Sequence, residues 1–283
     1  MHRALRAGEH GSRSTLPLRL LLAAALCGVA LSGCPLFKKT SSKAPSLQGM
    51  ALVPAGEFTM GRESEDASPD EAPVRSVWLD EFYIDRLEVT NAQYKSFADS
   101  VGRLYPNNPI WDDGYFLGKP DHPVINLTYE QAQAYCAWLG KRLPTEAEWE
   151  KAARGTDARI YAWGNEWDET RANLWGDEHG PDVFRRTAPV GSFPEGASPY
   201  GVLDMVGNVW EWCADWFELD YYSRAPDRNP PGPEGPAKWR VVRGGGFSSP
   251  RRPVGDVTTS NRSKNVGTQT IHHLGCRCAW SPR

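Results

Sequence analysis

After Tyr161 the sequence loses its helical period, and this constrains the fold more than any other feature. Glycine, proline, asparagine and aspartate interrupt short apolar pieces over residues 161–283, and the whole chain holds 27 glycines and 23 prolines. Such punctuation predicts turns and loops between short strands. Loops of this kind need bound ions or disulfides besides a core to hold them. We therefore expect an α+β fold: a loop-rich single domain with low regular secondary structure.

The preceding residues predict three helices that begin with the same local motif. In a capping box, a threonine hydroxyl and a Gln or Glu side chain three residues later bond to each other's free backbone N–H groups. Three pairs match this motif, namely Thr90 with Gln93, Thr128 with Gln131, and Thr145 with Glu148. Gly140 and Gly155 follow the second and third of these stretches and suit helix ends. Apolar and aromatic runs at 50–61 and 76–90 predict strands.

The amino terminus has the pattern of an export signal. Arginines precede an apolar run at 20–31, which is too short for a comfortable membrane span, and small residues then lead to Cys34. The ending LSGC at 31–34 resembles the bacterial lipobox, in which the cysteine becomes lipid-modified after cleavage. An ordinary secretory signal is the alternative. We expect residues 1–33 to be a lipoprotein signal peptide, residues 34–48 to be lipidated Cys34 and a flexible tether, and residues 49–283 to be the domain.

Lipid on Cys34 implies a membrane partner and a location in the cell envelope. Several acyl chains on one cysteine anchor a protein stably, whereas a single chain binds only marginally. The residue after Cys34 is Pro35 and not aspartate. In this it resembles lipoproteins that are sorted to the outer membrane, so we expect the domain to be anchored there and to face the periplasm. The net charge of −3 and the pI near 6.1 argue against a nucleic-acid partner, which would need a basic patch.

Cysteine usage suits an exported protein. Cys27 lies in the signal and Cys34 carries the lipid, which leaves four of the six cysteines in the domain. Exported domains meet an oxidising compartment, where disulfides form. Counting alone does not decide the pairing among Cys136, Cys213, Cys276 and Cys278.

Four stretches of the domain carry a family resemblance. They are KRLPTEAEWEKAARG at 141–155, DMVGNVWEWCADW at 204–216, RVVRGGGF at 240–247 and LGCRC at 274–278. In this order they resemble the formylglycine-generating enzyme, or sulfatase-modifying factor, family, over nearly all of 49–283. The resemblance implies a variant of the C-type lectin fold, stabilised by calcium, with a disulfide between Cys136 and Cys278. Cys213 and Cys276 are then either buried apolar thiols or a second bridge.

The resemblance also implies two structural calcium sites. Calcium takes roughly six to eight oxygen ligands and mixes carboxylates with backbone carbonyls in loops. The first site would use Asn173, Leu174, Asp182 and Phe184, and the second would use Asp204, Gly207, Val209 and Glu211. Taken from the residues alone, Asp204 and Glu211 could instead cap turns and face water.

The oxidation chemistry of the family lacks its residues here. By resemblance, active members bind Cu(I) between two cysteines after the double glycine and convert a substrate cysteine to formylglycine with O₂. Counting from Gly244 and Gly245, these two positions are Ser249 and Val254, and the serine of the oxygen pocket is replaced by Gly246. Soft thiolates suit Cu(I), whereas a hydroxyl and a methyl group do not. We therefore expect no bound copper and no catalytic residue at these positions.

Two arginines suggest a different use for this region. Arg251 and Arg252 lie beside Ser248 and Ser249, where the family would have its peptide groove. The forked hydrogen bonds of their guanidinium groups would suit an acidic peptide, sulfate or phosphate. The alternative is that the two arginines belong to a basic loop that faces water. The sequence thus favours a binding or scaffold module with an unknown protein or peptide partner over an enzyme. The alternative is an oxidoreductase that oxidises a protein cysteine or a related substrate through another site, with Cys213 and Cys276 as a relocated thiolate pair.

Overall fold

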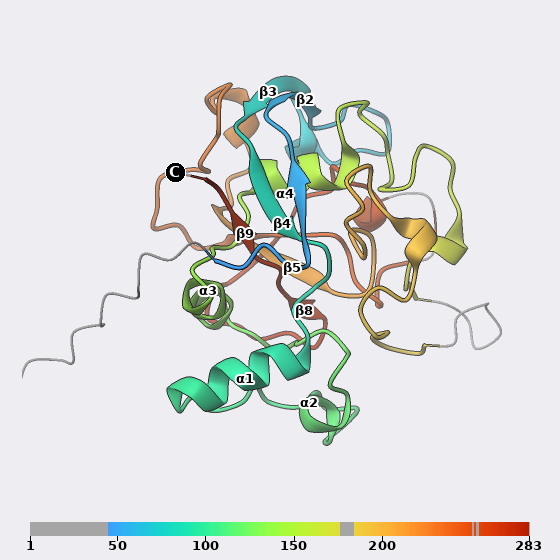
Figure 1. Ribbon diagram of the computed structural model, residues 1–283. Coiled ribbons are helices and arrows are strands. Elements are labelled where there is room, and N and C mark those ends of the chain that lie inside the picture. Colours follow the sequence, from blue (N-terminus) through green and yellow to red (C-terminus); the bar gives the residue numbers. More distant parts are fainter. Residues whose placement is uncertain (1–44, 176–183, 251, 253–254, 283) are drawn as a thin grey trace, which may run out of the picture. The chain divides into compact units, whose positions relative to one another are not determined.

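A computed structural model describes residues 45–175, 184–250, 252 and 255–282 (Figure 1). The expected signal peptide and Cys34 lie outside the described residues, as do Asp182, Arg251 and Val254, and the expectations for them stay predictions. The chain divides into two units, Met1–Ser41 and Ser42–Arg283. All of the described elements belong to the second unit, which is considered by itself.

The helices lie in the first half of this unit, and three of them begin at the predicted capping boxes. They are α1 (Asn91–Val101), α2 (Tyr115–Gly118), α3 (Tyr129–Trp138) and α4 (Glu146–Arg154). In α1, α3 and α4 the threonine hydroxyl accepts a bond from the N–H three residues later, and the Gln or Glu side chain accepts one in return. Gly140 and Gly155 follow α3 and α4 with positive φ, as the sequence predicted.

Short strands form three sheets within the described residues. The first has the order β1-β4-β9, from β1 (Met50–Val53), β4 (Phe82–Asp85) and β9 (Ala279–Trp280), so strands from both ends of the unit are neighbours (Figure 1). The second pairs β2 (Gly56–Met60) with β3 (Arg75–Leu79). The third has the order β7-β6-β5-β8, from β7 (Ser263–Asn265), β6 (Arg240–Arg243), β5 (Trp210–Trp216) and β8 (Leu274–Gly275). In it β5 and β8 run parallel, while the other neighbours are antiparallel.

Loops and 3-10 turns make up most of the rest. The turns are η1 (Pro69–Glu71), η2 (Glu169–Arg171), η3 (Pro194–Gly196), η4 (Tyr221–Ser223) and η5 (Gly255–Val257). In the described part of the chain after α4 there is no further α-helix, which confirms the expected loop-rich α+β class. None of the described helices is long and apolar enough to cross a membrane.

Buried side chains of these elements form two large apolar core clusters. Helix α4 contacts β2, β3, β5 and β6, and its Trp149 belongs to the first cluster together with Phe82 and Cys213. The second cluster joins residues of α1, α3 and β8, and it includes Cys136 and Cys278. These two cysteines form a disulfide with their Cα atoms 5.6 Å apart, as the family resemblance implied.

Candidate functional site

A run of three glycines turns the chain sharply after β6. Gly244 and Gly245 have φ of 98° and 72°, which residues with a Cβ rarely adopt. A Cβ at Gly245 would lie 2.8 Å from the carbonyl oxygen of Asp256, and one at Gly246 would lie 3.2 Å from Cδ1 of Trp210. The turn therefore lies close against β5 and η5, which it could not do with larger residues.

The hydroxyl of Ser249 is part of this turn. The residue is only 2% exposed, and its Oγ accepts a hydrogen bond from the backbone N–H of Gly246 at 3.1 Å. The same Oγ donates to Oδ2 of Asp256 at 3.1 Å. The Ser249 carbonyl accepts a bond from the backbone N–H of Trp175 at 3.0 Å. All of these partners lie within the protein, so the hydroxyl closes the turn.

A pocket of about 270 Å³ opens beside the glycine turn. Apolar side chains from β5, β6 and β8 form part of its wall, and polar side chains come from the turn, η5 and β7. The lining residues are Trp210, Val242, Ser248, Ser249, Asp256, Ser263, Lys264, Asn265, Ile271, His273 and Leu274. The fold thus brings three segments that are distant in the sequence to one small polar site.

A serine and a histidine meet in this pocket. The Oγ of Ser248 lies 2.9 Å from Nδ1 of His273. Burial lowers the pKa of His273 below its ordinary value, and His272 adds to this, while Asp256 opposes it. The imidazole is therefore neutral at neutral pH and can accept a proton. The arrangement can support hydrogen bonding to a ligand or activation of the hydroxyl.

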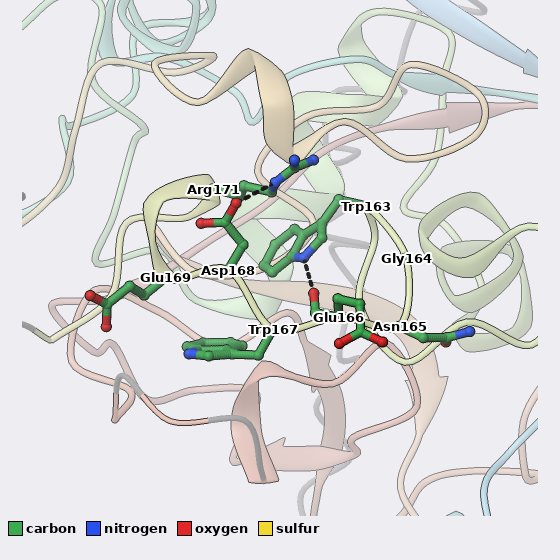
Figure 2. A pocket seen from close by; sticks show the side chains of 8 residues that line it. All are labelled: Trp163, Gly164, Asn165, Glu166, Trp167, Asp168, Glu169 and Arg171. Carbon is green, nitrogen blue, oxygen red and sulfur yellow. Dashed lines mark hydrogen bonds and ion pairs between the residues drawn. The ribbon is translucent and has the colours of Figure 1, made fainter.

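A larger pocket of about 620 Å³ lies in the loop that contains η2 (Figure 2). Trp163 and Trp167 line it with ring centroids 6.2 Å apart, and Trp163 Nε1 donates to the Glu166 carbonyl oxygen at 3.0 Å. Asp168 pairs with Arg171 at 2.8 Å. The lining has carboxylates but no serine, histidine, cysteine or lysine. It offers no nucleophile beside a base, so the smaller pocket is the stronger candidate site.

Comparison with known proteins decides the family. Residues 36–282 match the family model described as the sulfatase-modifying factor enzyme 1-like domain. The chain belongs to this family. It is 36% identical to the formylglycine-generating enzyme of Thermomonospora curvata over 83% of this chain and 94% of that protein. It is 32% identical to the inactive C-alpha-formylglycine-generating enzyme 2 of Bos taurus, over 81% of this chain and 87% of that protein. Among solved structures, PvdO from Pseudomonas aeruginosa has a TM-score of 0.70 at 28% identity, over 81% of this chain and 93% of that chain.

Two described thiols of this sulfatase-modifying-factor domain are not in a disulfide. Cys213 and Cys276 are both free and buried, so they make no second bridge. Cys213 belongs to the cluster around Trp149, and Cys276 to the cluster that holds the disulfide. Burial raises the pKa of both thiols well above its ordinary value. Both residues are therefore buried apolar thiols, one of the two states that the resemblance left open.

The first predicted calcium site is partly described. Asn173, Leu174 and Phe184 are within the described residues, and Asp182 is outside them. Asn173 is 1% exposed, and its Nδ2 donates to the Arg186 carbonyl oxygen at 2.7 Å and to Oδ1 of Asn208 at 3.0 Å. Its Oδ1 is buried with no hydrogen-bond partner among the described residues. A buried oxygen without a partner is costly, so this donor set fits a hard cation such as calcium.

The second predicted site contains a residue that is already paired. Glu211 is fully buried, and its carboxylate accepts bonds from Nε and Nη2 of Arg277 at 2.7 and 2.6 Å and from Trp149 Nε1 at 2.9 Å. Asp204 accepts one bond, from the backbone N–H of Gly191 at 2.6 Å. The described His, Cys, Asp and Glu side chains form no group of three around one point. The carbonyl oxygens of Gly207 and Val209 would therefore have to supply further ligands, as the resemblance implied.

Sequence reasoning missed a third carboxylate in this region. Glu88 is 1% exposed, and its carboxylate accepts a bond from Nδ2 of Asn208 at 2.6 Å. Burial raises the pKa of Glu88 well above its ordinary value, and the charges of Asp204 and Glu211 add to this. Arg277 is the guanidinium that opposes these acids. The fold therefore favours the protonated form of Glu88, and Glu211 is neutralised by its pair with Arg277. The available signal was an acidic residue inside the apolar run LEVT at 87–90.

The predicted anion groove is only partly present among the described residues. Ser248 and Ser249 line the smaller pocket, but the Ser249 hydroxyl is used internally. Arg252 is exposed and is not among the lining residues, and Arg251 lies outside the described part of the chain. The smaller pocket is therefore lined by Ser248 but not by Arg252.

Proposed function

We propose that this domain is a copper-free member of the sulfatase-modifying factor family that binds a protein or peptide segment beside the glycine turn. The observation that carries the proposal is the Ser249 hydroxyl, which stands at the first copper-cysteine position and is bonded internally to Gly246 and Asp256. A hydroxyl is a poor ligand for Cu(I), which prefers thiolates. The likeness to a relative that is named as inactive supports it. In this proposal, lipid on Cys34 holds the domain at the outer membrane, facing the periplasm.

The second candidate is the activity for which other relatives are named. The 36% identity to the formylglycine-generating enzyme of Thermomonospora curvata favours it. The chain would then oxidise a cysteine thiol with O₂ through a site that does not use a thiol at position 249. Copper binding and aldehyde formation separate this candidate from the first.

The first test concerns copper. The purified full-length chain is loaded with Cu(I) and incubated in air with a Cys-x-Pro-x-Arg peptide, and mass spectrometry follows aldehyde formation. We expect neither stoichiometric copper nor aldehyde. The matched variant, Ser249→Cys with Val254→Cys, restores two thiols at the family positions and should retain Cu(I) after desalting. Stoichiometric copper and turnover in the unaltered chain would overturn the proposal in favour of the oxidoreductase.

The second test concerns binding. Lys264 is exposed on β7 and lines the smaller pocket, so a photo-crosslinking amino acid at this position should give a discrete protein adduct in cells that express the chain. Ser223 is exposed on η4 and does not line the pocket, so the same amino acid there is the control. Equal cross-linking at both positions would count against a partner at the pocket.

The proposal includes structural calcium. The buried Oδ1 of Asn173, which has no hydrogen-bond partner among the described residues, supports it. A ligand present at a hundredfold its dissociation constant stabilises a fold by roughly 2.7 kcal/mol per site. We therefore expect EDTA to lower the melting temperature and excess calcium to restore it. Asn173→Ala should weaken this response, whereas Asn107→Ala, at an exposed position, should keep it. If neither EDTA nor calcium changed the melting temperature, the proposal of structural calcium would be wrong.

A further inference from the structure

Two turns from distant parts of the chain align a hydroxyl and an imidazole in the smaller pocket. Ser248 follows β6, His273 precedes β8, and Ser248 Oγ lies 2.9 Å from His273 Nδ1. The His273 carbonyl accepts a bond from the backbone N–H of Trp210 at 2.8 Å. The Phe247 ring meets the imidazole edge-on, with centroids 6.1 Å apart. Because neighbours hold both partners, the hydroxyl and the base already meet in the free protein.

The pair differs chemically from its neighbours. Burial keeps the imidazole of His273 neutral, which is the form that can take a proton. Asp256 and His272 are the charged or titratable side chains that act on it. Ser249 is not equivalent to Ser248, because its hydroxyl already donates to Asp256. A serine bonded to a neutral histidine is the arrangement that activates a hydroxyl as a nucleophile.

Asn265 adds a donor to the same pocket. It ends β7, it is 5% exposed, and its Nδ2 has no hydrogen-bond partner among the described residues. A buried N–H without an acceptor is costly, so an oxygen of a ligand that reaches it is stabilised. Side-chain amides of this kind stabilise the negative oxygen that forms during acyl transfer.

We propose that this pocket transfers acyl groups from short-chain esters to water, with Ser248 as the nucleophile, His273 as the base and Asn265 as the donor to the oxyanion. Ser248 Oγ forms a bond to the carbonyl carbon, its proton moves to Nδ1 of His273, and the carbonyl π electrons move to the oxygen. These electrons return as the ester C–O bond breaks, and the alcohol leaves with the proton. Water then attacks the acyl carbon by the same route, which releases the acid and restores Ser248.

The size and lining of the pocket set the substrate class. Its volume of about 270 Å³ is slightly smaller than the volumes of typical small-molecule sites, which are roughly 300–1,000 Å³. Trp210, Val242, Ile271 and Leu274 give it an apolar wall that suits a short acyl chain. The steps need no co-reactant except water. The activity therefore goes beyond the proposed binding role and does not depend on the partner.

The test treats the purified full-length chain with p-nitrophenyl acetate and, separately, with a fluorophosphonate probe. We expect a burst of p-nitrophenolate and a stable probe adduct that peptide mass spectrometry maps to Ser248. Ser248→Ala should abolish the adduct, and His273→Gln should slow its formation by roughly 100-fold or more, as for loss of a general base. Asn265→Leu should slow ester turnover while the adduct still maps to Ser248. p-Nitrophenyl decanoate should be turned over far more slowly than the acetate.

Matched variants make the test specific. His122→Gln removes a histidine outside the pocket, whose Nδ1 lies 2.9 Å from Oγ1 of Thr187, and Ser223→Ala removes an exposed serine outside the pocket. Both should label at the rate of the unaltered chain. An adduct away from Ser248, or labelling no faster than in the heat-unfolded chain, would overturn the proposal. Because the readout uses neither copper nor a partner, such a failure is distinct from failure of the proposed binding role.

Discussion

Burial changes the chemistry of single carboxylates in this chain, and Asp215 is a clear case. It is 3% exposed on β5, and its Oδ2 accepts a bond from the backbone N–H of Glu146 at 2.8 Å. Burial raises the pKa of Asp215 to about 8, and the charge of Glu146 adds to the shift. The folded chain therefore keeps a proton on Asp215 at pH values where the unfolded chain has lost it.

This difference predicts a pH dependence. The unfolded carboxyl releases its proton near 3.8 and the folded one near 8, so between these values Asp215 makes the free energy of unfolding fall as pH rises. Asparagine does not titrate and still accepts the bond from Glu146. Asp215→Asn should therefore become more stable relative to the unaltered chain from pH 5 to pH 8, as measured by urea unfolding. Asp220→Asn, at an exposed position, is the control; stability curves that stay parallel for Asp215→Asn would refute the shift.

At the residue scale, the sequence predicts which residues occupy the motif positions but not which partners they contact. Counting from Gly244 predicts that Ser249 stands where the family resemblance implies a cysteine, because a position within a motif can be counted. The bond from Ser249 to Asp256 depends on how the glycine turn folds back, which no local pattern records. Glu88 was missed for the same reason, since its partner Asn208 is 120 residues further along the chain.

At the element scale, local chemistry decides where the helices begin. The three capping boxes were predicted correctly because donor and acceptor lie only three residues apart. Strands were harder to predict. The runs 50–61 and 76–90 each contain two strands, since Pro54 and Ala55 separate β1 from β2, and Asp80 and Glu81 separate β3 from β4. The parallel pairing of β5 with β8 joins distant segments and has no signal in either one.

The cap of α3 gives a prediction for one element. Thr128 Oγ1 accepts a bond from the backbone N–H of Gln131 at 3.3 Å, and Gln131 Oε1 accepts one from the Thr128 N–H at 2.8 Å. Thr128→Ala removes the hydroxyl and should lower the free energy of unfolding by roughly 1 kcal/mol. Thr128→Ser keeps the hydroxyl and should lose much less. Equal losses in the two variants, measured by urea unfolding, would show that the methyl group and not the cap matters.

At the scale of the whole unit, buried arginines in the carboxyl-terminal part of the chain form ion pairs with α4. Arg243 bonds to Glu146 and Glu150 at 2.9 and 2.7 Å, and Arg262 bonds to Glu146 at 2.8 Å. The sequence predicted that the loops need more than an apolar core, and the disulfide confirms part of this. The arginine pairs were not foreseen, because charged residues in a sequence are usually exposed and nothing local marks those that are buried.

The disulfide gives the prediction for the whole unit. Cys136 in α3 and Cys278 before β9 are 142 residues apart, so the bond closes a long loop and restricts the unfolded chain strongly. Cys136→Ala with Cys278→Ala should lower the free energy of unfolding by roughly 2–5 kcal/mol. Dithiothreitol should destabilise the unaltered chain in urea unfolding and leave the double variant unchanged, because Cys213 and Cys276 are already free thiols. If the reductant destabilised both proteins equally, the stabilisation would have to come from something other than this bond.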